Sequence, residues 1–236
     1  MSNRLPATRV RLDAVLAARA PTLPGPATRG ALAAVEDLEE NAGEGAVWCQ
    51  GPARGACLSK ALTEAALAQH LAPLKCDGYA LEARARVVSG QVVAGLDELE
   101  RAAGMASDRV ECLQQLESIA HTARDEKRAQ AALDRIANLG CSDNAECARN
   151  LIWVAQHEEA RGSPNKALAL YKRANLRTPE DDAVLESIAR LALAGGLHAE
   201  AAEDFEKLAR RHPEDSRWKL AAQGERTAAL RAVEGL

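Results

Sequence analysis

The chain has 236 residues, of which 47% are hydrophobic and only 3% aromatic, and its net charge is −4 at pH 7. This acidity argues against nucleic acid as the main partner, because phosphate binding needs a basic stripe. No apolar run reaches the roughly 18–20 residues that a membrane-spanning helix requires. Abundant alanine and leucine with few β-branched residues favour helices over strands.

Residues 1–27 differ in character from the rest of the chain. The first thirty residues carry five arginines against one acid, together with four prolines. This composition predicts a flexible or short-helical tail that ends in a Pro-rich linker over 21–26. The tail has no apolar h-region of the length that a signal peptide needs.

Residues 28–75 form the next predicted segment, an N-terminal helical cap. Its clearest element is an apolar-periodic stretch over 57–72 that ends at Pro73. Proline cannot continue a helix, so we expect one helix that stops just before it.

A repeat dominates residues 76–215. The phrase RTPED at 177–181 returns as RHPED at 211–215, and Pro179 and Pro213 are 34 positions apart (213 − 179). A fixed period of this size indicates stacked supersecondary units. Counting Pro213 as position 32 predicts four units. Their bounds are 76–109, 110–147, 148–181 and 182–215, and the second is four residues longer because of the loop over 139–147.

Each of the last two units reads as two helices that are separated by a glycine turn and followed by a proline, and the same apolar spacing can be traced in the two units before them. Small residues recur where the two helices of a pair must approach closely, and a large residue fills the space beside them. In the last two units the small residues are Ala155, Ala167, Ala189 and Ala201, and the large ones are Tyr171 and Phe205. Gly95 is interpreted in the same way, as a point of close packing.

This pattern resembles the tetratricopeptide repeat (TPR), which has 34 residues, small residues at positions 8 and 20, an aromatic at 24 and proline at 32. The chain departs from it at position 4, where Leu151 and Leu185 replace tryptophan, and at Ser107, which replaces proline. The resemblance implies an all-α, right-handed superhelical solenoid of antiparallel helix pairs with about four units. A C-terminal capping helix over 216–236 closes it.

The family also implies a concave protein-binding face, made by positions 2, 5, 9 and 12 of the first helices. The candidate residues are Arg84, Gln114, Ser118, His121, Arg149, Ile152, Gln156, Glu186 and Arg190. The lysine/asparagine clamp with which some members bind a terminal carboxylate is absent, because Ala80 and Arg84 stand at the matching positions. For any one of these residues the alternative is an ordinary solvated surface.

Six cysteines form the second informative pattern, and none belongs to a C-x-x-C pair, which argues against zinc and thioredoxin-like sites. The cysteines lie at helix ends and in loops, unlike typical core thiols. Three bridges follow from this placement: Cys49–Cys57, Cys76–Cys112 and Cys141–Cys147. Six cysteines allow 15 pairings, and six free buried thiols remain the alternative. Bridges would indicate an oxidising compartment.

Other chemistry is sparse, and the sequence predicts no catalytic residue, metal site or cofactor. The run His157–Glu158–Glu159 is interpreted as a solvated polar helix face rather than a ligand cluster. Trp48, Trp153 and Trp218 are interpreted as core or cap residues.

These patterns predict a non-enzymatic protein-binding scaffold. We expect an exported cell-envelope protein that helps to assemble a machine such as a secretion, pilus or outer-membrane complex, with its leader absent from this chain. Membrane association would be peripheral, through a partner or a lost lipid anchor. The alternatives are a cytosolic adaptor with reduced cysteines and a helical accessory domain or fragment of a larger protein.

Overall fold

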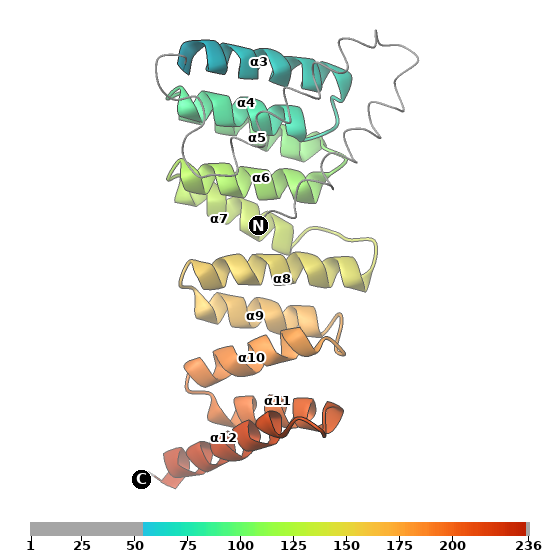
Figure 1. Ribbon diagram of the computed structural model, residues 1–236, viewed down its shortest axis with the longest axis vertical. Helices are drawn as coiled ribbons and strands as arrows, with labels where there is room; N and C mark the ends of the chain where they lie inside the picture. The colour runs from blue at the N-terminus through green and yellow to red at the C-terminus, as the bar shows by residue number, and fades with distance from the viewer. Residues whose placement is uncertain (1–53, 235–236) are drawn as a thin grey trace. The chain divides into compact units, whose positions relative to one another are not determined.

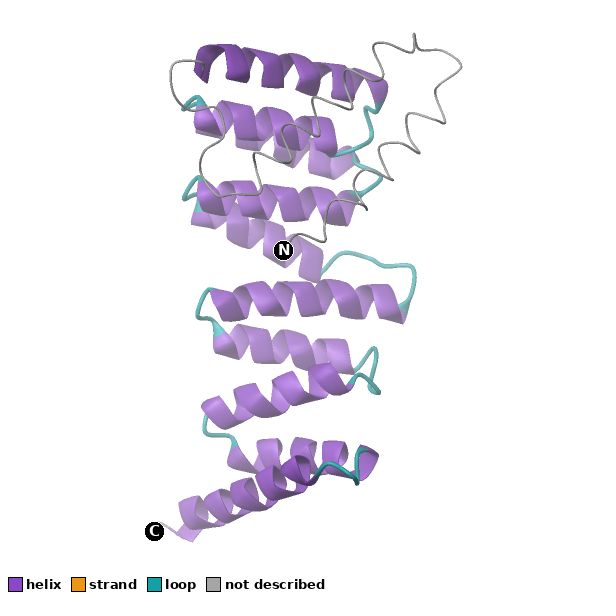
Figure 2. Ribbon diagram, viewed as in Figure 1, coloured by secondary structure: helices purple, strands orange, loops and turns teal. Residues whose placement is uncertain are grey.

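The structure, a computed structural model, describes residues 54–234. This range folds into ten α-helices and contains no strand (Figure 2). The helices are α3 (Arg54–Leu71), α4 (Asp77–Val88), α5 (Val92–Met105), α6 (Arg109–Thr122), α7 (Glu126–Ala137), α8 (Asn144–Ala160), α9 (Pro164–Asn175), α10 (Asp182–Ala194), α11 (His198–Arg211) and α12 (Ser216–Glu234).

The described residues divide into two compact units, 54–132 and 133–234, and the boundary falls inside α7. In the first unit α3 packs on α4, α4 on α5 and α5 on α6; in the second, the helices from α8 to α12 pack each on the next. Within each unit, short turns join consecutive helices and make them antiparallel (Figure 1). The fold is therefore all-α and built of packed helix pairs. The right-handed superhelix stays a prediction.

Aspartates start two of the first helices of these pairs. The Asp181 carboxylate accepts hydrogen bonds from the backbone N–H groups of Ala183 and Val184 at the start of α10. Asp143 does the same for the N–H of Glu146 in α8, at 2.7 Å. Such caps satisfy donors that have no partner inside the helix, and they fix where the helix begins.

The turns within the pairs share one backbone feature. Each turn contains one residue with a positive φ, at position 15 of its predicted 34-residue repeat. These residues are Gly90, Arg124, Gly162 and Gly196. Glycine has no Cβ to oppose this left-handed conformation, whereas Arg124 adopts it with φ 62° at some cost. These four residues are 34, 38 and 34 positions apart (124 − 90, 162 − 124 and 196 − 162).

The seam between paired helices is narrow, as the small residues predict. Ala155, Ala167, Ala189 and Ala201 are completely buried. In the first unit, a Cβ on Gly95 would lie 2.9 Å from the carbonyl oxygen of Ala83, so that only glycine fits without a shift of backbone. The interpretation of Gly95 as a close-packing residue is confirmed.

The C-terminal helix α12 closes the core of the second unit. Trp218 is buried, and its ring lies 5.9 Å from that of Phe205, centroid to centroid. Around them gather the buried residues Leu185, Ala189, Ala192, Ala201, Leu208 and Ala222. Trp218 is a core residue, as predicted; Trp153 is half-buried on α8, where its ring stacks on His157.

One interpretation of the sequence is wrong. Glu158 does not lie on a solvated face, because its side chain is only 2% exposed and Lys166 Nζ lies 3.7 Å from its Oε1. Position 158 falls on the side of α8 that faces the core, where the second and fourth repeats carry the buried residues Ala120 and Ala192. Glu159, one residue further along the helix, is half-buried and ion-paired.

Among the helices between residues 54 and 234, none combines the length and the apolar character that crossing a bilayer requires.

Candidate functional site

The predicted binding residues of the second unit lie on the first helices α8 and α10. Arg149, Gln156, Glu186 and Arg190 are exposed, and Ile152 is half-buried. The opposite sides of these helices hold buried residues such as Val154 and Ile188. We call the exposed residues of α8 and α10 the first-helix face of the second unit.

An ion pair joins the two helices of this face. Arg190 Nη1 and Nη2 contact the two oxygens of the Glu159 carboxylate, at 2.6 and 2.9 Å. The hydrogen bond from Glu159 raises the pKa of Arg190 above its ordinary value. Tyr171 on α9 lies close by, and burial raises the pKa of its phenol while its hydrogen bond with Ser187 opposes that shift. In terms of the 34-residue repeat, the ion pair joins position 12 of one repeat (Glu159) to position 9 of the next (Arg190).

In the first unit the predicted residues lie on α4 and α6. Arg84 is half-buried and donates a hydrogen bond to the Gln115 side chain, which joins the two first helices. Gln114 is half-buried, whereas Ser118 and His121 are exposed; His121 Nδ1 lies 2.9 Å from Glu126. These exposed and half-buried residues form the first-helix face of the first unit. Ala80, which the same register places here, is buried.

A disulfide also joins α4 and α6. Cys76 precedes α4, Cys112 lies in the first turn of α6, and their Cα atoms are 5.1 Å apart. Asp108 supports the same corner, with its carboxylate 3.4 Å from the backbone nitrogen of Cys76 and 3.7 Å from Lys75 Nζ. This is the pairing that the sequence analysis predicts.

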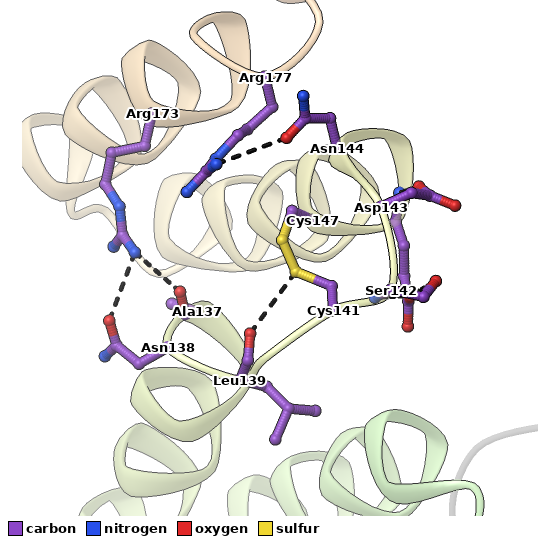
Figure 3. The surroundings of a disulfide bond; sticks show 11 residues. Ala137, Asn138, Leu139, Cys141, Ser142, Asp143, Asn144, Cys147, Arg173 and Arg177 are labelled. Atoms are coloured by element: carbon purple, nitrogen blue, oxygen red, sulfur yellow. Dashed lines mark hydrogen bonds between the residues drawn. A yellow bond between two sulfur atoms is a disulfide. The ribbon is translucent and has the colours of Figure 1, made fainter.

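A second disulfide, Cys141–Cys147, closes the loop between α7 and α8, with a Cα–Cα distance of 5.5 Å. Figure 3 shows Asp143 and Ser142 beside it, at the start of α8. The Glu146 carboxylate accepts hydrogen bonds from the hydroxyl and the backbone N–H of Ser142, and these lower the pKa of Glu146. The loop is thus held covalently and by hydrogen bonds.

The remaining predicted bridge lies partly outside the described residues. Cys57 is disulfide-bonded, but its expected partner Cys49 falls in the part of the chain that the structure does not describe, as does Trp48. No cysteine within residues 54–234 is a free thiol.

A pocket of about 500 Å³ lies behind the Cys141–Cys147 loop, wholly within the second unit. Its walls come from the end of α7, the loop itself, the start of α8 and the end of α9. The lining residues are Ile136, Ala137, Asn138, Leu139, Cys141, Cys147, Asn150, Leu151, Arg173, Leu176 and Arg177. Sequence reasoning missed this pocket, although the four-residue insertion in the repeat marks its position.

An ionic cluster lies at the other end of α10. The Asp182 carboxylate contacts the Arg211 guanidinium and His212 Nε2, each at 2.6 Å. Its hydrogen bonds, first with Arg211 and then with His212, lower the pKa of Asp182; the bond to Asp182 raises the pKa of His212. The cluster links the start of α10 to the end of α11.

No three His, Cys, Asp or Glu side chains in the described range gather in a way that would hold a metal ion. The structure brings charged and amide side chains together on the two first-helix faces and in the loop pocket.

None of the known family models matches this sequence, and no curated protein sequence matches it either. Among solved structures, the chain is similar to the MamA protein, with 15% identity, 78% of this chain and 94% of that one covered, and a TM-score of 0.43. It is also similar to PilF of Pseudomonas aeruginosa, with 13% identity, coverage of 85% and 89%, and a TM-score of 0.42.

The packed helix pairs and the recurring turn at position 15 are consistent with a scaffold of the TPR type. Membership of that family stays a prediction of the sequence.

Proposed function

We propose that this chain is a non-enzymatic scaffold whose first-helix faces bind a segment of another protein. The observation that carries the proposal is the cross-helix pairing of Arg190 with Glu159 and of Arg84 with Gln115. These contacts align neighbouring first helices side by side through their polar residues. A surface built in this way offers spaced donors and acceptors to an extended segment.

We further propose that the protein works in an oxidising compartment, such as a bacterial cell envelope. The Cys76–Cys112 and Cys141–Cys147 pairs support this, because disulfides form and persist outside reducing cytosol. In such a setting the scaffold would help to assemble or stabilise a multiprotein machine, for example a secretion, pilus or outer-membrane complex.

Site-specific photo-cross-linking in the native host tests the binding face. A photoreactive residue at Gln156, exposed on α8, should trap one defined partner. The same residue at Ala169, exposed on the second helix α9 of the same pair, is the matched control and should trap none. Equal cross-linking at both positions would contradict the assignment of the face.

A thiol assay tests the compartment. The protein purified from its host without reductant and then unfolded should show no reactive thiol at Cys76, Cys112, Cys141 or Cys147. Quantitative labelling of these four cysteines would indicate a cytosolic adaptor with reduced thiols instead.

A further inference from the structure

The pocket behind the Cys141–Cys147 loop has a mixed lining of basic, amide and apolar groups. Two of its lining residues are arginines, and none is an aspartate or a glutamate. Arg173 comes from the last turn of α9 and Arg177 follows that helix; in Figure 3 both side chains extend toward the end of α7 and the start of α8. The pocket therefore carries positive charge without an acidic residue of its own.

The two arginines differ in the hydrogen bonds that their guanidinium groups already make within the protein. Arg173 Nη2 donates to the carbonyl oxygen of Ala137 at 2.8 Å, and it thereby caps the end of α7. Arg177 Nη1 lies 3.4 Å from Asn144 Oδ1, longer than a typical hydrogen bond to a guanidinium. Its side chain is exposed, so its guanidinium is available to an anion at the mouth of the pocket.

Asn150 gives independent evidence for a ligand. It lines the same pocket, is only 9% exposed, and its Nδ2 is buried without a hydrogen-bond partner in the described part of the protein. A buried donor that is left without an acceptor destabilises the folded protein, because it loses its hydrogen bond to water and gains no other. Native structures contain few such groups, and each calls for a reason. An acceptor oxygen supplied by a ligand would be such a reason.

The rest of the lining is apolar. Ile136, Leu139 and Leu151 form its walls, and Leu176 stands 82% exposed at the end of α9. A free phosphate or sulfate would leave these side chains without a partner. An aliphatic side chain next to a carboxylate satisfies both kinds of group.

We propose that this pocket binds an acidic protein segment in which an aspartate or glutamate adjoins an aliphatic residue. The carboxylate accepts hydrogen bonds from the Arg177 guanidinium and from Asn150 Nδ2, and the aliphatic side chain lies against Leu139 and Leu176. The site is separate from the first-helix faces, and it does not depend on whether those faces bind a partner.

A short peptide is the probe. Titration of the ¹⁵N-labelled full chain with acetyl-Gly-Leu-Glu-Leu-Gly-amide should give saturable amide shifts confined to residues 136–151 and 173–177. Saturation should fall within about 10 mM, the range expected of a ligand with two polar anchors. The same peptide with Gln in place of Glu should bind at least about tenfold more weakly, because it loses the charge-assisted hydrogen bond.

Two variants identify the anchors. Arg177→Gln should weaken binding about tenfold, whereas Arg210→Gln, at an exposed arginine of α11, should leave it unchanged. Asn150→Leu should abolish binding without lowering the melting temperature, because it removes an unsatisfied buried donor and keeps the side-chain volume. A purely structural asparagine would instead destabilise the fold when it is replaced.

The proposal is overturned if the peptide gives no saturable shift up to about 10 mM, the limit expected for such a ligand, or if Arg177→Gln binds as the wild type does. It is also overturned if inorganic phosphate gives the same shifts with equal affinity, since the pocket would then be a general anion site. Cross-linking from Gln156 is a separate measurement, so failure here leaves the first-helix faces untouched.

Discussion

Neighbouring first helices are joined differently in the two units. In the first unit, α4 and α6 are linked covalently through Cys76–Cys112. In the second, α8 and α10 are linked by the ion pair of Arg190 with Glu159. The covalent joint lies where the repeat lacks its proline, at Ser107, and the ionic joint lies where Pro179 is present. The chain thus has a cross-link where its repeat pattern is weaker.

The two joints also differ in energy and in what can break them. A disulfide acts mainly on the unfolded chain, so its effect grows with the length of the loop that it closes. A partly exposed ion pair contributes about 0–1 kcal/mol and is screened by salt. The first joint should therefore respond to reductant and the second to ionic strength.

The largest expected effect comes from breaking the covalent joint. Replacing Cys76 and Cys112 with alanine releases a loop with a sequence separation of 36. It should lower the free energy of unfolding by about 4 kcal/mol, measured by urea denaturation. The short Cys141–Cys147 loop should contribute about 2 kcal/mol by the same measure.

Arg190→Gln breaks the ionic joint of the second unit, as the cysteine replacements break the covalent joint of the first. It should lower the free energy of unfolding by less than about 1 kcal/mol. If it destabilised the protein as much as loss of Cys76–Cys112, the distinction between the joints would be wrong.

The next largest effect concerns the seam between paired helices, which both units share. Ala201 is completely buried, so Ala201→Leu should cost about 1–3 kcal/mol, because a packed interior tolerates little added volume. Ala199 lies two residues away and is exposed, and the same change there should cost much less. Equal urea midpoints for the two variants would show that the repeat register is misplaced.

A smaller effect is expected at the turns within the pairs. Arg124 has the left-handed conformation that glycine has at the equivalent position elsewhere. Arg124→Gly should therefore raise stability by up to about 1 kcal/mol. Gly196→Ala, where a Cβ would meet nothing within 4 Å but the φ is +74°, should lower it by about 1 kcal/mol. Thermal melts of both variants check this, and a gain in the second would refute the argument.

The smallest effect is a pH dependence at the Asp182–His212 contact. The raised pKa of His212 means that its contribution is full below its unfolded pKa, about 6.5, and is lost as the pH rises through the folded value. The lowered pKa of Asp182 means that its contribution is lost as the pH falls through the acidic range. His212→Gln should therefore lower the melting temperature at about pH 5.5 but hardly at about pH 9. An equal decrease at both pH values would exclude the ionic contact as the cause.

The sequence by itself determined the periodic part of this protein. Proline at 179 and 213 and small residues at 167 and 201 are local features that recur at a fixed spacing, so they predict helix pairs and their register. The pairs Cys76–Cys112 and Cys141–Cys147 followed as well, because each joins positions that the register or a short loop already places together. Helix α3 ended near Pro73 for the same local reason.

Only the tertiary structure decided the features that depend on which side chains meet. Glu158 reads as part of a charged, solvated run, yet the helix turns it toward Lys166 and the core. Arg190 and Glu159 are 31 residues apart and meet only because α8 and α10 are neighbours. The pocket is lined by Asn150, Arg173 and Leu139, which come from three different segments and meet only in the folded chain. Periodicity specifies which side of a helix is apolar, but the packing of neighbouring helices decides which polar groups that side encloses.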